Sequence, residues 1–262
     1  MKKIIVCLLF FSSCLSNNNR NEQQVEDEPI PGIPYEISLE KAIDNIEQAG
    51  LTEIGSSITY IPLETTSRSV LKELKKIIVT DLYIAVYDLS NILVFDSSGH
   101  FLKQIGRKGQ GPGEYSMLIR DYCFSLDRNK IYFLDVRNTC FEYDVKGQFL
   151  NSFKMDSVPD QFLPITDDLF VWHCRNTPEY RDPIGPSLII SDLNNNITKT
   201  YKNYHKRTSK PGIMVTGHSP LYFHQGDIRF KEFGVDTLYT VTIEELIPYA
   251  ILNLGNKGIV TK

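Results

Sequence analysis

The stretch of this sequence most able to do chemistry is a glycine-rich loop that follows an apolar run. Within eight residues it holds four glycines and a proline, namely Gly106, Gly109, Gly111, Pro112 and Gly113. Such loops can wrap a phosphate, because residues without a side chain let backbone N–H groups converge on an anion. A Walker A loop needs Gly-Lys-Ser/Thr after four residues, but Pro112 follows Gly111. The dinucleotide fingerprint also fails, because Glu114 stands at its third glycine position.

The same loop can instead form the corner between two units of a repeating β architecture. In that role Tyr115 packs into the core and Glu114 hydrogen-bonds the turn. Arg107 and Lys108 lie at the tip, where they are either solvated or face a ligand. Because both phosphate motifs fail, we expect a structural connector here.

Histidines are the next candidates, because they could supply ligands to a metal ion. None of them forms a short-range pair such as HxxxH, and in an alternating strand His173 and Cys174 would point to opposite faces. The histidines concerned are His173, His205, His218 and His224. We therefore expect no metal and no cofactor. The sequence also offers no combination of nucleophile, base and orienting group, so we assign no catalytic residue.

The cysteines divide into an N-terminal pair and three others. Cys123, Cys140 and Cys174 share no metal-ligand spacing and permit at most one disulfide, so we expect buried thiols. At the N-terminus, Lys2 and Lys3 precede an apolar run that is too short to span a bilayer, and small residues precede Cys14. This order predicts an export signal over residues 1–14.

The residues around Cys14 resemble the lipobox of bacterial lipoproteins, in which cleavage precedes a cysteine that becomes lipidated. Phe11 departs from the usual leucine, and the alternative is an ordinary secretory signal with an incidental cysteine. Residues 15–34 are rich in Asn, acids and Pro, which predicts a flexible tether. Helical spacing after Ser38 then predicts a short helix that stops at Gly50, and a strand follows at 57–64.

Strands and turns recur at a fixed interval along the rest of the chain. An aromatic-Asp-x-x-Gly-x-apolar signature at Asp96 and Gly99 returns 48 residues later at Asp144 and Gly147. A weaker copy has Asp192 and Asn195. The Asp can accept from turn amides and the Gly or Asn tolerates positive φ, so each copy predicts a hairpin. A further copy over 213–254 has lost both residues.

Four such units predict blades of a β-propeller, each a four-stranded antiparallel sheet. We expect an all-β fold with blades at about 70–106, 118–154, 161–202 and 213–254. Aromatic residues, nearly all Tyr and Phe, make up 11% of the chain, which favours strands.

The sequence resembles the six-bladed β-propeller lipoproteins of Bacteroidetes, which are related in architecture to NHL-repeat proteins. The resemblance covers about residues 50–255, and its most specific segment is Gly109-Gln110-Gly111-Pro112-Gly113-Glu114-Tyr115. It implies that an N-terminal strand, here 57–64, pairs with the last blade to close the ring. This chain supplies only about four blades, so we expect an open arc, a truncated product or fragment; the alternative is a closed four-bladed ring. Exposed blade edges would favour self-association.

The resemblance implies a cell-envelope protein with a lipid anchor in the outer membrane, facing either the periplasm or the cell surface. We expect a non-catalytic binding or scaffold module for a peptide, glycan or partner protein, with Arg107, Lys108, Tyr180 and Arg181 as ligand-facing residues. The formal charge of -4 speaks against nucleic acid as a partner. The alternatives are an NHL-like metal-dependent lyase or hydrolase with a central-channel site and a nonfunctional truncated member.

Overall fold

The computed structural model describes residues 5–8, 32, 34–44, 48, 50–116, 118–174, 185–202, 220–232 and 235–255. Nearly all of the regular structure is β-strand, which confirms the predicted fold class. Four antiparallel sheets follow one another along the chain, and in each of them strands that are consecutive in sequence are hydrogen-bonded neighbours. These sheets are the blades of a propeller. The described residues thus form four blades, not the six of the family that the sequence resembles.

The blades have regular boundaries. Blade 1 contains β4 (Lys76–Val79), β5 (Tyr83–Tyr87), β6 (Ile92–Asp96) and β7 (Phe101–Ile105). Blade 2 contains β8 (Ile119–Phe124), β9 (Lys130–Asp135), β10 (Thr139–Asp144) and β11 (Phe149–Lys154). Blade 3 contains β12 (Pro159–Pro164), β13 (Phe170–Cys174), β14 (Pro186–Ser191) and β15 (Ile197–Lys202). Blade 4 contains β16 (Leu221–His224), β17 (Asp227–Phe230), β18 (Thr237–Val241) and β19 (Leu246–Asn253).

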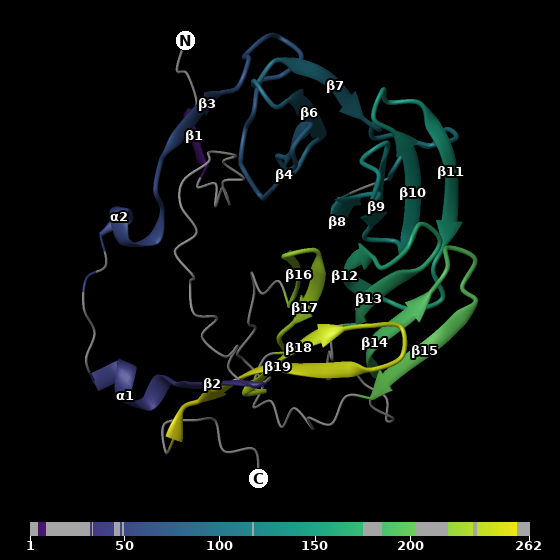
Figure 1. Ribbon diagram of the computed structural model, residues 1–262. Helices are drawn as coiled ribbons and strands as arrows, with labels where there is room; N and C mark the ends of the chain where they lie inside the picture. Colours follow the sequence, from purple (N-terminus) through teal and green to yellow (C-terminus); the bar gives the residue numbers. More distant parts are fainter. Residues whose placement is uncertain are drawn as a thin grey trace, which may run out of the picture.

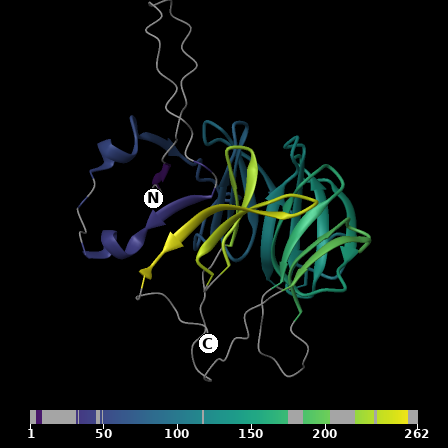
Figure 2. The same cartoon turned by 60° about the horizontal axis from the view of Figure 1, so that its bottom comes forward.

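The blades are arranged around one side of a central space, with the first strand of each blade innermost (Figure 1). The segment that precedes blade 1 runs along the remaining side (Figure 1). It contains α1 (Leu39–Asp44), α2 (Leu51–Ile54) and β3 (Thr59–Pro62). Seen from a second direction, this segment lies to one side of the blades, at the left of the picture (Figure 2).

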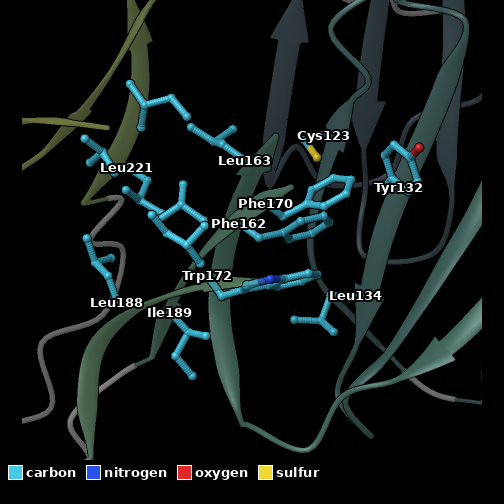
Figure 3. Packing of buried hydrophobic residues seen from close by; sticks show 14 of the residues in the cluster. Cys123, Tyr132, Leu134, Phe162, Leu163, Phe170, Trp172, Leu188, Ile189 and Leu221 are labelled. Carbon is cyan, nitrogen blue, oxygen red and sulfur yellow. The ribbon is translucent and has the colours of Figure 1, made fainter. Parts of the chain in front are cut away.

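Apolar side chains from facing blades interlock to form the core. One cluster joins blades 1 and 2, and a second joins blades 2, 3 and 4. In the second cluster the Trp172 ring stacks on Phe162 with centroids 4.8 Å apart, and Phe170 lies beside both (Figure 3). A third cluster covers the other face of blade 1, where Leu63 and Leu71 pack on the blade. Burial of both faces of a blade thus depends on its neighbours.

A polar chain along the innermost strands connects all four blades. The Lys76 ammonium of blade 1 lies 2.5 Å from the Asp121 carboxylate of blade 2. The second oxygen of Asp121 accepts from the Phe162 amide of blade 3 at 3.0 Å. The Gln161 side chain donates to the Leu221 carbonyl of blade 4 and accepts from its amide, at 2.7 and 3.0 Å. Because these groups are largely buried, each bond fixes the relative height of two neighbouring blades.

The N-terminal strands differ from the expectation. The strand that joins blade 4 is β2 (Tyr35–Ser38), which pairs in parallel with β19. The strand expected at 57–64 to close the ring is β3, which pairs with β1 (Ile5–Leu8) and lies against blade 1. Two contacts explain why β2, and not β3, joins blade 4. The Tyr35 ring meets the Tyr249 ring edge to face at 5.3 Å, whereas Ile61 and Leu63 pack on the apolar face of blade 1.

Other N-terminal expectations also need correction. Ser38 ends β2 and directly precedes α1, and the single helix expected to stop at Gly50 is two short helices, α1 and α2, with Gly50 directly before α2. Strand β1 lies within residues 1–14, for which the export signal stays a prediction. Most of the expected tether, and residues 203–219 before blade 4, lie outside the described residues.

We expect Asp121→Ala to lower the free energy of unfolding by about 2–4 kcal/mol, because it leaves Lys76 and the Phe162 amide without their shared acceptor. Urea denaturation measures the change. The control is Asp81→Ala, at an exposed acid in the turn between β4 and β5, which should stay within about 0.5 kcal/mol of the parent protein. Equal stabilities of the two variants would contradict the role of Asp121.

Candidate functional site

The glycine-rich loop connects β7 to β8 and runs along the junction of blades 1 and 2. Gly106 and Gly113 adopt positive φ of 65° and 75°, which residues with a Cβ adopt poorly. At Gly106 a Cβ would come within 3.1 Å of the Phe133 ring, and at Gly113 within 2.6 Å of the Phe149 ring. Both positions therefore need glycine for the backbone and for the space.

Two tyrosines fix the loop to the blades. Tyr115 is buried, its ring meets Phe133 edge to face at 5.5 Å, and its hydroxyl donates to the Ser90 carbonyl at 2.5 Å. Burial raises the pKa of Tyr115. The Tyr143 hydroxyl donates to the Gly113 carbonyl. The loop is thus held from blade 1 and from blade 2.

The side chain of Glu114 fills the concave side of the loop. One carboxylate oxygen accepts from the Gly111 amide at 2.9 Å, and the other pairs with the Arg107 guanidinium. The Gly111 amide and then Arg107 lower the pKa of Glu114. A Cβ on Gly109 would collide with this carboxylate. The place where a phosphate would have to bind is therefore already occupied by an anion of the chain itself.

A hollow of about 330 Å³ opens to solvent beside the loop. It is lined by Gln104, Gly106, Arg107, Pro112, Gly113, Glu114, Tyr143, Gly147 and Phe149. Of the expected ligand-facing residues, Arg107 belongs to this lining, whereas Lys108 forms an isolated bridge to Tyr115 instead. Tyr180, Arg181 and the expected lipidation residue Cys14 lie outside the described residues. The hollow thus combines guanidinium, amide and aromatic groups on a fixed backbone.

The blade turns have the geometry that their sequence signature describes. Asp96 accepts from the amides of Ser98 and His100, each at 2.9 Å. Asp144 accepts from the Gln148 amide at 2.7 Å, and Asp192 accepts from the amides of Asn194 and Asn196. Positive φ occurs at Gly99, Gly147 and Asn195. These residues shape hairpins and do not converge with the hollow, apart from Gly147 in its lining.

Two acids between strands, Asp88 and Asp135, cap turns. Asp88 is buried and accepts from the amides of Ser90 and Asn91. Asp135 is buried and accepts from the amides of Arg137 and Thr139. One oxygen of each carboxylate is thus bonded to the backbone of its own turn.

A cluster that no sequence pattern indicates lies between blades 3 and 4. The Ser187 hydroxyl donates to the Glu232 carboxylate, and His173 Nε2 lies 3.8 Å from the other oxygen of that carboxylate. In a serine-hydrolase triad the histidine stands between the hydroxyl and the acid, whereas here the acid stands between the other two. The three residues come from separate strands and loops, so their spacing in sequence carries no signal. Their arrangement joins the two blades.

Cys123 and Cys140 are buried free thiols, as expected, whereas the free thiol of Cys174 is only partly buried. Burial raises the pKa of Cys123 and Cys140, and it raises the pKa of Cys174 to about 12. A nucleophilic cysteine needs its thiolate, so these thiols are poor candidates for that role. Within the part of the chain that the structure describes, no group of three His, Cys, Asp or Glu side chains could hold a metal ion.

A family model described as "Domain of unknown function (DUF4934)" matches residues 34–262. The chain belongs to the DUF4934 family. The match begins at the strand β2 and extends through all four blades, so it includes the glycine-rich loop and its hollow. Among curated proteins, no match to this DUF4934 chain was found.

A solved structure with the same fold is that of a Bacteroides fragilis protein described as exported. It aligns with a TM-score of 0.60 at 22% identity, over 74% of this chain and 55% of that one. The DUF4934 chain thus spans about half the length of this relative. Two WD40 propellers align less well, the C-terminal domain of Sif2 with a TM-score of 0.41 and the Doa1 domain with 0.44, each at 14% identity. They cover 71% and 72% of this chain, and 48% and 59% of their own.

We expect Glu114→Gln to destabilise the protein at pH 7. We also expect the variant to lose less stability than the parent protein when the pH is lowered. A carboxyl group whose pKa is lowered by folding stabilises the fold above its unfolded pKa of about 4.3, and this contribution disappears as the pH falls through the folded pKa. The difference in melting temperature between parent and variant should therefore shrink from pH 7 to about pH 3. Glu245→Gln, at an exposed turn, is the control. A difference that does not change with pH would contradict the role of the Glu114 charge.

Proposed function

We propose that this DUF4934 chain is a non-catalytic binding or scaffold module of the cell envelope. It binds a peptide, a glycan or a partner protein, and a lipid on Cys14 anchors it to the outer membrane. The observation that carries the binding role is the hollow at the junction of blades 1 and 2. Its backbone is fixed by Tyr115 and Tyr143 and it remains open to solvent. A preformed surface of this kind reduces the entropy lost when a ligand binds.

The lining of the hollow suits a polar ligand with an apolar side. The Phe149 ring offers an apolar surface, Gln104 supplies amide groups, and Arg107 can donate several hydrogen bonds while it remains paired with Glu114. The Arg107 side chain is 77% exposed, so a ligand reaches it without any movement of the blades.

Two observations support a place in the envelope. The sequence opens with the order of charged, apolar and small residues that marks an export signal, and Cys14 follows directly. A protein of the same fold is described as exported. Among the described residues, no helix is long and apolar enough to cross a membrane.

The anchor is tested by expressing the full chain in a Bacteroidetes host with radioactive palmitate. We expect the mature protein to carry label and to sediment with outer membranes, and Cys14→Ala to lose both properties. Cys7→Ala is the matched control, because it changes the other cysteine of the N-terminal segment. An unlabelled mature protein, or unchanged membrane attachment of Cys14→Ala, would show that the anchor is wrong.

The binding role is tested by probing arrays of envelope glycans and of peptides with the purified protein. For the strongest ligand we expect Arg107→Ala to weaken binding about tenfold, the usual effect of removing a well-placed arginine contact. Lys108→Ala removes a neighbouring exposed charge that does not line the hollow, and its affinity should stay within about twofold. Equal losses in both variants would indicate general charge attraction instead of a site.

A further inference from the structure

Strand β3 is fixed to blade 1 at its C-terminal end, through Glu64. The Glu64 amide donates to the Gly99 carbonyl at 2.8 Å, and the Glu64 carboxylate accepts from the Phe101 amide at 2.7 Å. At Gly99, φ is +92° and a Cβ would lie 2.3 Å from the Pro62 carbonyl oxygen. Only glycine permits this approach. The position of β3 is thus determined by the turn between β6 and β7.

The other edge of β3 carries main-chain groups that can pair with a further strand. Ile61 and Leu63 pack on blade 1 while Tyr60, Pro62 and Glu64 are exposed, so the chain is extended from Thr59 to Glu64. In an extended chain the N–H groups of alternate residues point to the same side. Since the Glu64 amide points to Gly99, those of Thr59 and Ile61 point to the opposite edge.

An apolar strand already lies on that edge in the full chain. β1, with the sequence Ile-Val-Cys-Leu, pairs antiparallel with β3 in the register Ile5↔Pro62, Val6↔Ile61, Cys7↔Tyr60 and Leu8↔Thr59. Pro62 has no N–H group, but the pairing with β1 does not need one there, because the N–H groups that point to β1 are those of Thr59 and Ile61. The seated strand shows what the edge accepts, a short extended segment of apolar residues.

The face of blade 1 beside β3 is less completely covered than the same face of blade 2. Pairing registers make Ile77 and Val79 of β4 equivalent to Tyr122 and Phe124 of β8. Tyr122 and Phe124 are 0% and 5% exposed beneath blade 1, whereas Ile77 and Val79 remain half-buried. Within the fold this face is an established packing surface, and β3 covers only part of it.

We propose that this edge of β3, once β1 has been removed, is a strand-acceptor site for an extended apolar segment of a partner protein, which adds antiparallel to Thr59–Pro62. Main-chain hydrogen bonds provide the affinity in this mode of recognition, and side chains that point to the blade provide the selectivity. The proposal rests on the proposed function in one respect, since cleavage before Cys14 removes β1 and vacates the edge.

The test uses the processed protein purified from its host membranes and a fluorescent peptide with the sequence of residues 3–10, carrying Cys7→Ser and a soluble lysine tail. Fluorescence polarisation should show saturable binding. By the register, peptide N-methylation at Val6 and Leu8 blocks donors that face β3, and it should weaken binding at least about tenfold. N-methylation at Ile5 and at position 7 blocks donors that face away, and it is the matched control with about unchanged affinity.

On the protein, Thr59→Pro removes one edge donor from an exposed residue and should weaken binding about tenfold. Thr59→Ala keeps the N–H group and should bind within about twofold; melting temperatures confirm that both variants fold. Equal binding of the two N-methylated peptides, or of the two variants, would overturn the proposal. So would light scattering that shows a dimer broken by Thr59→Pro, because the occupant would then be a second copy.

Mass spectrometry of the purified protein separates this proposal from the proposed function. If residues 1–13 are still present, the processing is wrong, and the titration is repeated on a chain that lacks them. Peptide binding there would support the acceptor edge without the anchor. No binding there would overturn the acceptor edge.

Discussion

The contact on which the arrangement depends is the one between Asp121 and its two neighbours. A buried carboxylate costs free energy unless it is paired, and Asp121 is paired with Lys76 of blade 1 and with the Phe162 amide of blade 3. Apolar interlocking alone tolerates sliding of one blade past the next, because hydrophobic contact has no preferred direction. The directional bonds of Asp121 remove that freedom. The glycine-rich loop keeps its shape only because blades 1 and 2 are held in this relative position.

Local chemistry explains which parts of the fold the sequence predicts. Asp96 and Gly99 specify their hairpin through bonds within five residues, so the repeat and the all-β propeller could be deduced from the chain alone. Strand β2 could not, because its partner β19 is remote in sequence and the pairing is parallel. The cluster of Ser187, His173 and Glu232 could not be predicted either, because its members are also remote from one another in sequence.

The sequence predicts that the glycine-rich loop is a connector, but it does not predict the hollow beside the loop. Its glycines predict a corner, and counting them removes two phosphate motifs. The sequence also predicts that Glu114 hydrogen-bonds the turn, but it does not show that this carboxylate takes the amide that an anion would need. Nor can it give the hollow, since Phe149 and Tyr143 come from the following blade. A site built across a blade junction becomes visible only when both blades are placed.

The two ends of the described arc differ in chemistry. The cross-strand row of blade 3 that faces blade 4 is Leu163, Val171 and Ile190, all of them buried. The equivalent row of blade 4 is Tyr222, Arg229 and Thr240, in which the Arg229 guanidinium lies 3.9 Å above the Tyr249 ring. Blade 1 instead presents an apolar face, covered by Leu63, Leu71 and Ile61. A buried arginine favours contact with polar groups, whereas the apolar face of blade 1 favours contact with apolar side chains. The two ends therefore do not complement each other as successive blades do.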